Sequence, residues 1–290
     1  MALAILRFGE LWLKSEGVKK RFLLKLVSNI KALLGYNGID YELKLARTRI
    51  FVNVADYEKA AKVFNRVFGL SSFSFAVEVL TDKQEMVTEV TKIASNFKKK
   101  DTFAIRVKRE GKHKFTSQQL AAELGSAVVE KYGNKVDLSN PKKTIYVEVL
   151  GDKSYIFDEK INCAGGLPVG VEGSAVAYLE DDFYSVAAAY MIMKRGCKII
   201  PVLKKGISDV KIKKILLKYD PKFEIKYVVE ENEKYNKIGA IARKTYSKAV
   251  VLGETFDKIK FDDQKVELPV FRPLIGFDGE VIDELFNKLK

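Results

Sequence analysis

The feature that most constrains this fold is a strand, a basic turn and a helix start that follow one another between residues 103 and 117. From Phe103 to Arg109 apolar side chains alternate with charged ones, which predicts a strand with one buried face and one cationic face. Gly111 permits a tight reversal, and Thr116 or Ser117 can cap the helix that follows. The sequence therefore predicts a sharp strand-to-helix corner.

Basic side chains are concentrated in this corner. They would lie beside a helix N-terminus, where free N–H groups and the helix dipole attract anions. We therefore predict a phosphate-binding surface; the alternative is that the turn is a solvated charged loop. The ring of Phe115 adds a surface on which a nucleic-acid base can stack. The predicted contacts in the corner are Arg106, Lys108, Arg109, Lys112, His113, Lys114 and Phe115.

The charge of the whole chain favours a polyanionic partner. The formal net charge is +13, and the excess of basic residues is concentrated in residues 1–171. No apolar run reaches membrane-spanning length, and the apolar part of the N-terminus is too short for a signal peptide, so we expect a cytoplasmic protein that does not bind membranes. With two cysteines and one histidine, no ordinary zinc site can be assembled, and we predict no metal site.

The apolar periodicity divides the chain into three predicted domains, of which the first covers residues 1–55. Its pattern predicts a strand, a Lys-rich helix over about 18–34 that Gly35 ends, and two further strands. The basic side chains of this region either contact RNA or keep the helix soluble. The further candidates for RNA contact are Lys14, Lys20 and Arg21.

The second predicted domain covers residues 56–171 and contains the basic corner. Helices are predicted near 57–67 and 83–97, and two closing strands are joined by a turn at Gly151 and Asp152. Three lysines, Lys98–Lys100, follow the second of these helices, where they would oppose the negative end of its dipole. The pattern predicts an α/β arrangement of two layers.

The third predicted domain covers residues 172–290, where strand and helix patterns alternate. This alternation predicts a doubly wound, mostly parallel sheet. A short apolar strand is predicted at 176–179 and a helix at 183–195. In such sheets ligands bind at the carboxyl ends of the strands, which directs attention to the residues that follow this first strand.

The order of these elements, the basic turn with Phe115-Thr-Ser117, and the closing run Gly165-Gly-Leu-Pro-Val-Gly170 together resemble the THUMP RNA-binding domain. More narrowly, they resemble the version found in 4-thiouridine synthetases (tRNA sulfurtransferases), and the resemblance covers nearly the whole chain. It implies an α/β protein with a ferredoxin-like N-terminal domain, an α/β THUMP domain and an adenine nucleotide hydrolase-like domain. It also implies that tRNA is the partner and is held at its acceptor end.

The resembled enzymes carry a pyrophosphate loop of pattern Ser-Gly-Gly-x-Asp-Ser after the first strand of the last domain. The run Met193–Cys197 anchors the comparison and places this loop at Glu180–Ser185, where only the final serine matches. Asp181 and Asp182 replace the glycines whose bare backbone lets N–H groups close on phosphate. Alternatively, these acids only cap the following helix. The degenerate nucleotide site implied by the resemblance contains Val176, Ala177, Ser185 and Gly253.

Two functions follow from these observations. The first is a tRNA-binding THUMP protein, linked to tRNA modification, with an inactive ATP site, no catalytic residues and no bound cofactor. The second is an active ATP-dependent sulfurtransferase that makes 4-thiouridine with a divergent nucleotide loop, ATP and Mg²⁺. A further interpretation is a partner of an active synthetase or of a sulfur donor, and the sequence gives no oligomeric state.

The sulfur chemistry of the resembled enzymes uses cysteines of the last domain, and often one in an added rhodanese-like domain. We expect that extension to be lacking here, because the sequence ends at Lys290. Cys197 is expected to be a packing residue, and Cys163 is expected to have no catalytic role. His113 lacks a partner that would make it a general base.

Overall fold

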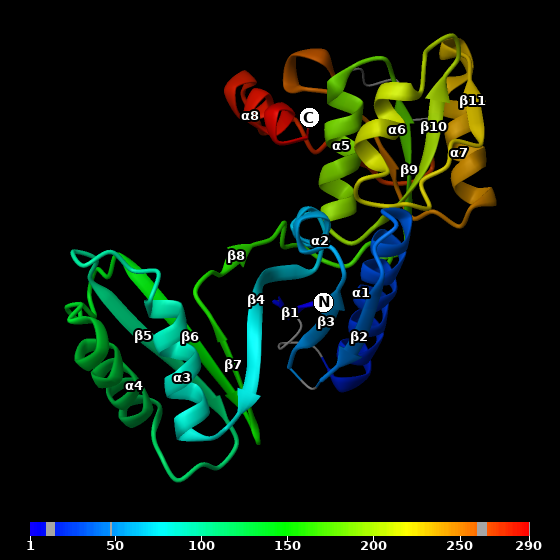
Figure 1. The fold of residues 1–290 in the computed structure, drawn as a ribbon. Helices are drawn as coiled ribbons and strands as arrows, with labels where there is room; N and C mark the ends of the chain where they lie inside the picture. The colour runs from blue at the N-terminus through cyan, green and yellow to red at the C-terminus, as the bar shows by residue number, and fades with distance from the viewer. Residues whose placement is uncertain (10–14, 47, 260–265, 290) are drawn as a thin grey trace. The chain divides into compact units, whose positions relative to one another are not determined.

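The computed structural model describes residues 1–9, 15–46, 48–259 and 266–289 (Figure 1). Its elements form two compact units, each assembled from segments that are far apart in the sequence. The first unit contains Met1–Arg7, Tyr41–Tyr57 and Ser72–Asn162; the second contains Phe8–Asp40, Glu58–Ser71 and Cys163–Lys290. The predicted boundaries 1–55, 56–171 and 172–290 stay a prediction.

The first unit is organised around a mixed sheet with strand order β2-β3-β1-β4-β7-β6-β5, and β8 pairs with β4. The strands β5 and β6 run parallel, whereas β7 is antiparallel to both β6 and β4. The strands are β1 (Ala2–Phe8), β2 (Tyr41–Leu45), β3 (Ile50–Val54), β4 (Leu70–Leu80), β5 (Phe103–Glu110), β6 (Lys143–Leu150), β7 (Lys153–Phe157) and β8 (Ile161–Asn162).

Two helices, α3 (Lys83–Ala94) and α4 (Ser117–Tyr132), pack on this sheet. Their apolar residues recur at helical spacing and meet alternate residues of the strands, which is how a helix and a pleated strand present one face each. The shared core includes Met86, Val90, Leu120, Leu124, Val128, Ile145, Val147 and Val149. The expected strand, turn and helix between residues 103 and 132 are confirmed, as is the turn at Gly151 and Asp152.

A buried ion network crosses the sheet of the first unit. Glu148 of β6 accepts one bond from Arg7 Nε at 2.8 Å and another from Arg49 Nε at 2.9 Å, and each side chain is less than a tenth exposed. Burial alone would raise the pKa of Glu148, but the two guanidinium groups outweigh burial and lower it. Glu148 is therefore charged, and both arginines need it, because a buried charge without its counterion is costly.

The second unit contains a five-stranded parallel sheet with strand order β11-β10-β9-β12-β13. The first strand lies in the centre, the next two add on one side and the last two on the other, which confirms the doubly wound sheet. The strands are β9 (Ser174–Leu179), β10 (Lys198–Lys204), β11 (Tyr227–Val229), β12 (Val250–Val251) and β13 (Val270–Phe271).

Both faces of this parallel sheet are covered. Helices α5 (Phe183–Lys194), α6 (Val210–Leu216) and α8 (Gly279–Leu289) contribute to one core, and α7 (Lys234–Lys244) contributes to the other. Successive residues of β9 are buried on opposite faces, so the strand is an unbroken apolar run, as parallel strands with two covered faces are. Two short 3₁₀ helices, η1 (Glu231–Glu233) and η2 (Phe256–Lys258), follow β11 and β12.

The run Gly165–Gly170 bonds through its backbone to the end of α5 and to the segment after α2 (Tyr57–Phe64), and the side chain of Asn29 on α1 (Glu16–Tyr36) donates to Val169 O. Gly69 donates to the Gly165 carbonyl at 2.8 Å, and the residue after Gly166 donates to Lys194 O at 2.9 Å. A Cβ on Gly166 would lie 2.3 Å from that same carbonyl oxygen, and its φ is +74°. Only glycine therefore permits this backbone clasp.

Three expected boundaries were wrong. Gly35 lies inside α1; the helix ends at Tyr36, and Gly38 supplies the positive φ of +64°. The next helix ends at Phe64 rather than Val67, because the chain turns before Gly69. The helix at 83 ends at Ala94, so the dipole explanation for Lys98–Lys100 is wrong. No helix among the described residues is long and apolar enough to cross a bilayer.

We predict that Glu148→Gln lowers the free energy of unfolding by about 3–5 kcal/mol, because two buried guanidinium groups lose their counterion. A lowered pKa in the folded state means that the contribution of Glu148 is present above the pKa of an unfolded glutamate and is lost as pH falls through the folded value. The advantage of the wild type in urea unfolding should therefore shrink below about pH 4.

The matched control is Glu123→Gln, which removes the exposed pair between Lys83 and Glu123, 3.1 Å apart. Such a pair contributes about 0–1 kcal/mol. Equal urea midpoints for the Glu148 and Glu123 variants would contradict a structural role for the buried network.

Candidate functional sites

The basic corner is held by backbone and side-chain bonds on both sides. β5 ends at Glu110, whose carboxylate accepts a bond from Thr48 Oγ1 at 2.9 Å, and Gly111 follows with φ +100°. Thr116 caps α4: its hydroxyl accepts from Gln119 N at 3.1 Å, and Gln119 Oε1 accepts from Thr116 N at 2.8 Å. The sequence suggested that the N–H groups at the start of α4 were open to an anion, but the capping box already bonds two of them. The basic side chains therefore attract an anion more strongly than the helix end does.

The predicted cations of the corner differ in how open they are. Arg106 donates to the Leu138 carbonyl, and Arg109 Nη1 donates to Gly111 O at 3.4 Å, so both guanidinium groups also order the backbone. Lys108, Lys112 and Lys114 are exposed and make no ion pair with another described residue. Three ammonium groups therefore face solvent around one turn.

The two rings of the corner lie against each other. The His113 and Phe115 centroids are 5.4 Å apart with an angle of 23°, and His113 Nε2 donates to Glu110 O at 3.1 Å. Phe115 also packs against the core of the first unit. Of the other candidates, Lys20 and Arg21 are exposed on α1, and Lys14 lies outside the described residues.

The nucleotide site expected in the second unit would lie at the carboxyl end of β9, beside β12, where the winding of the sheet reverses. Val176 and Ala177 do not reach this edge, because they are buried in the middle of β9, one in each core. Ser185 and Gly253 do meet there. A Cβ on Gly253 would lie 2.4 Å from Ser185 N, so the backbone after β12 packs directly on the start of α5.

The loop from Glu180 to Ser185 is closed on itself. Asp182 Oδ1 accepts from Ser185 N at 2.9 Å, so Asp182 is the N-cap of α5. In return, the Ser185 hydroxyl accepts from Glu180 N at 3.1 Å. Two N–H groups at the end of the strand are therefore already bonded to side chains of the same loop.

Three carboxylates at this edge, those of Glu180, Glu231 and Glu254, are paired with cations, and Asp181 is exposed. Glu180 and Glu231 lie 3.2 and 3.0 Å from Lys204 Nζ, and the Tyr178 hydroxyl donates to Glu231 at 3.1 Å. Glu254 is bound by Arg272 Nε at 2.6 Å, with both side chains 12% exposed. The three acids of the loop were expected to face a nucleotide together, but Asp182 bonds to the helix and Glu180 bonds to Lys204.

The cysteines and metal-binding groups show no catalytic arrangement in the part of the chain that is described. Burial raises the pKa of the Cys197 thiol, with a smaller contribution from Glu172, which fits a packing residue. Cys163 is partly buried beside the Gly165 turn, and its backbone N–H donates to Ser71 O at 3.0 Å. Among the residues outside 10–14, 47, 260–265 and 290, no three His, Cys, Asp or Glu side chains are placed to hold a metal ion.

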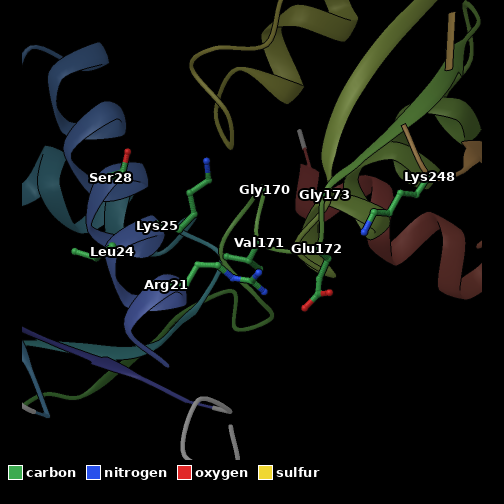
Figure 2. A pocket seen from close by; sticks show the side chains of 9 residues that line it. All are labelled: Arg21, Leu24, Lys25, Ser28, Gly170, Val171, Glu172, Gly173 and Lys248. Carbon is green, nitrogen blue, oxygen red and sulfur yellow. The ribbon is translucent and has the colours of Figure 1, made fainter. Parts of the chain in front are cut away.

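Sequence reasoning missed a cavity of about 650 Å³ on the second unit (Figure 2). Arg21 and Lys25 approach it from α1, and Lys248 approaches from the segment before β12. The loop Gly170–Gly173 lies between them. The Lys-rich helix was the available signal, but nothing in the sequence pairs it with a lysine more than 200 residues later.

Comparisons with known proteins match this architecture along the whole chain. The model of the ThiI ferredoxin-like domain matches residues 3–74, and the model of the THUMP domain matches residues 80–159. Among solved structures, PH1313 from Pyrococcus horikoshii Ot3 has a TM-score of 0.86 at 27% identity, covering 100% of this chain and 99% of that one. A 4-thiouridine synthetase, solved as an RNA complex with bound ATP, has a TM-score of 0.82 at 23% identity, covering 100% and 85%.

Similar sequences carry one name. A probable tRNA sulfurtransferase of Methanobrevibacter smithii is 34% identical, with 94% of this chain and 82% of the relative covered. One of Methanocaldococcus jannaschii is 32% identical, covering 98% and 87%. With a ferredoxin-like domain, a THUMP domain and a doubly wound sheet in the same order, this chain belongs to the tRNA sulfurtransferase family.

Proposed function

We propose that this protein binds tRNA through the basic corner between β5 and α4, and that its doubly wound domain no longer carries a working ATP site. The observation that carries the second part is the closed loop from Glu180 to Ser185. The protein would then act in tRNA modification as an RNA-binding relative of the sulfurtransferases rather than as the enzyme that activates the nucleoside.

RNA binding is supported by the chemistry of the corner. Lys108 near the end of β5 and Lys112 and Lys114 in the following turn are exposed point charges, which suits contacts to phosphate rather than reading of base edges. The bonds of Arg106 and Arg109 to the backbone leave further donors of each guanidinium group for a ligand. The THUMP match over residues 80–159 covers this turn, and the similar 4-thiouridine synthetase was solved with RNA. We extend this to the acceptor end of tRNA as the region that is bound.

The loop at the end of β9 does not fit a triphosphate. Two N–H groups that a phosphate there could use, those of Glu180 and Ser185, are each bonded to a side chain of the loop. A phosphate would also meet the exposed carboxylates of Asp181 and Asp182: two like charges about 4 Å apart repel by roughly 1 kcal/mol in water and about 4 kcal/mol at an effective dielectric of 20. The helix dipole stabilises a bound anion by only about 0.3–1 kcal/mol. The donors and the charges therefore both oppose nucleotide phosphates.

The second candidate is an active sulfurtransferase, and one observation favours it. Relatives named probable tRNA sulfurtransferase align over nearly the whole chain, including the doubly wound domain. Nucleoside mass spectrometry of tRNA from a deletion strain distinguishes the RNA-binding protein from the active sulfurtransferase. Loss of 4-thiouridine, restored by the wild-type gene but not by the Asp182→Ala variant, would favour the enzyme and contradict an inactive site.

Calorimetric titration gives a direct prediction for the nucleotide site. We expect MgATP to release no binding heat up to about 1 mM, the upper end of the usual substrate range, while intact tRNA binds under the same conditions. Micromolar ATP binding would overturn the closed-loop interpretation. The tRNA titration is the control that the protein is folded and competent.

The basic corner gives a prediction in the salt dependence of binding. The double variant Lys112→Ala/Lys114→Ala should lower the slope of log K against log salt by about 1.8, since each phosphate contact contributes about 0.9. The matched control is Lys226→Ala/Lys237→Ala, whose ammonium groups are paired with Glu224 at 3.0 Å and Glu233 at 3.9 Å. Equal slopes for the two double variants and the wild type would show that the turn does not contact the phosphates of tRNA.

The cap of α5 gives a prediction for hydrogen exchange. Asp182→Ala should speed exchange of the Ser185 amide, because a lost cap destabilises a helix by about 1 kcal/mol. Asp182→Asn keeps an acceptor oxygen and should exchange like the wild type. If the alanine variant also exchanges like the wild type, Asp182 does not close the loop.

A further inference from the structure

The cavity in Figure 2 shares part of its lining with a second cavity, and the two are taken together here. The first cavity holds about 650 Å³ and the second about 140 Å³, and both are lined by Lys25, Ser28 and Gly170. We call this the basic groove. One wall is α1, and the other consists of loops that precede strands of the parallel sheet. Its cations are Arg21, Lys25, Lys198, Lys222 and Lys248.

The charges of the basic groove are not balanced within the part of the chain that is described. Its two carboxylates, Glu172 and Asp220, face five cations, and none of the five forms an ion pair with another described residue. Lysines elsewhere in the same unit do pair: Lys204, Lys205 and Lys213 each contact a carboxylate. Unpaired cations that converge in a concave surface attract an anion, because the field of one sign is concentrated there.

Glycines position two of these cations. Gly170 has φ +89°, and a Cβ on it would lie 2.7 Å from Lys25 Cε, so the lysine stem crosses the turn where a side chain is missing. Gly173 has φ +88°, and its Cβ would lie 3.6 Å from Lys248 Cε. Asn29 Nδ2 donates to Val169 O at 3.2 Å and fixes this turn on α1. The two ammonium groups therefore flank one ordered loop (Figure 2).

The lining of the basic groove favours a phosphate backbone over a base. Its aromatic residue is Tyr219, which is 8% exposed and stacks inside the core on Phe68 at 5.3 Å. A pocket for a base would offer an open ring or an enclosed apolar wall. The basic groove offers ammonium and guanidinium groups around backbone, which is the chemistry that contacts phosphodiesters without reading sequence.

We propose that the basic groove is a second RNA-binding site, which holds phosphodiesters of the same tRNA that the basic corner binds. This inference rests on the proposed function, since it takes tRNA as the ligand. It assigns to RNA contact four lysines that no motif marks, and it gives the doubly wound domain a role that does not need ATP.

The test measures tRNA affinity over a range of salt for Lys25→Gln/Lys248→Gln, which removes two charges and keeps most of each stem. We expect the slope of log K against log salt to fall by about 1.8. Combined with Lys112→Ala/Lys114→Ala, the fall should be about 3.6, because distant contacts add. The matched control is Lys226→Gln/Lys237→Gln, and unchanged thermal unfolding shows that each variant is folded.

The outcomes separate the two proposals. If the wild type does not bind tRNA, the proposed function fails. If the corner variant lowers the slope and the groove variant does not, the corner stands and the basic groove is overturned. Hydrogen exchange gives an independent readout: bound tRNA should protect peptides covering residues 21–28 and 166–173 in the wild type, and lack of protection there contradicts the inference.

Discussion

The arrangement of the second unit depends on one close approach of backbone to backbone. Gly166 lies against the Lys194 carbonyl, nearer than any side chain allows, and the residues on either side donate to carbonyls of two different segments. This contact fixes the loop that follows, and that loop in turn seats Lys25 and Lys248. A short glycine-rich run thus helps to set the geometry of the basic groove, which its last residue, Gly170, also lines.

The stability of the doubly wound sheet does not depend on the loop that follows its first strand. Its stability comes from apolar residues on both faces of β9 and from the helices that cover them. The loop at the end of β9 contributes little to these cores, so its residues can change without loss of the sheet. In this loop Asp182 accepts a bond from Ser185 N, the Ser185 hydroxyl accepts one from Glu180 N, and Lys204 pairs with the Glu180 carboxylate.

Local patterns in the sequence predicted the elements well, because alternation and helical spacing report directly on which face is buried. The β5 strand, its turn and the Thr116 cap were predicted, and so was the parallel sheet. Helix ends were less predictable: Gly35 continues α1 because the chain reverses at Gly38 instead. A glycine near a helix end allows termination and does not require it.

Contacts between distant residues could not be predicted. The pairing of Glu180 with Lys204, and the approach of Lys248 to the helix that carries Lys25, follow from the winding of the sheet. No local pattern records such pairs, and a single sequence carries no covariation. The candidates Val176 and Ala177 show the same limit, since a residue can belong to the right strand and still lie in its middle.

The shared carboxylate of Glu148 has a consequence for how such chains diverge. Both of its arginines lie in the region matched by the ferredoxin-like model, and the glutamate itself lies in the region matched by the THUMP model. A hybrid that took one region from a relative lacking this pairing would therefore contain a buried charge without its counterion. The ion network thus couples the two matched regions electrostatically.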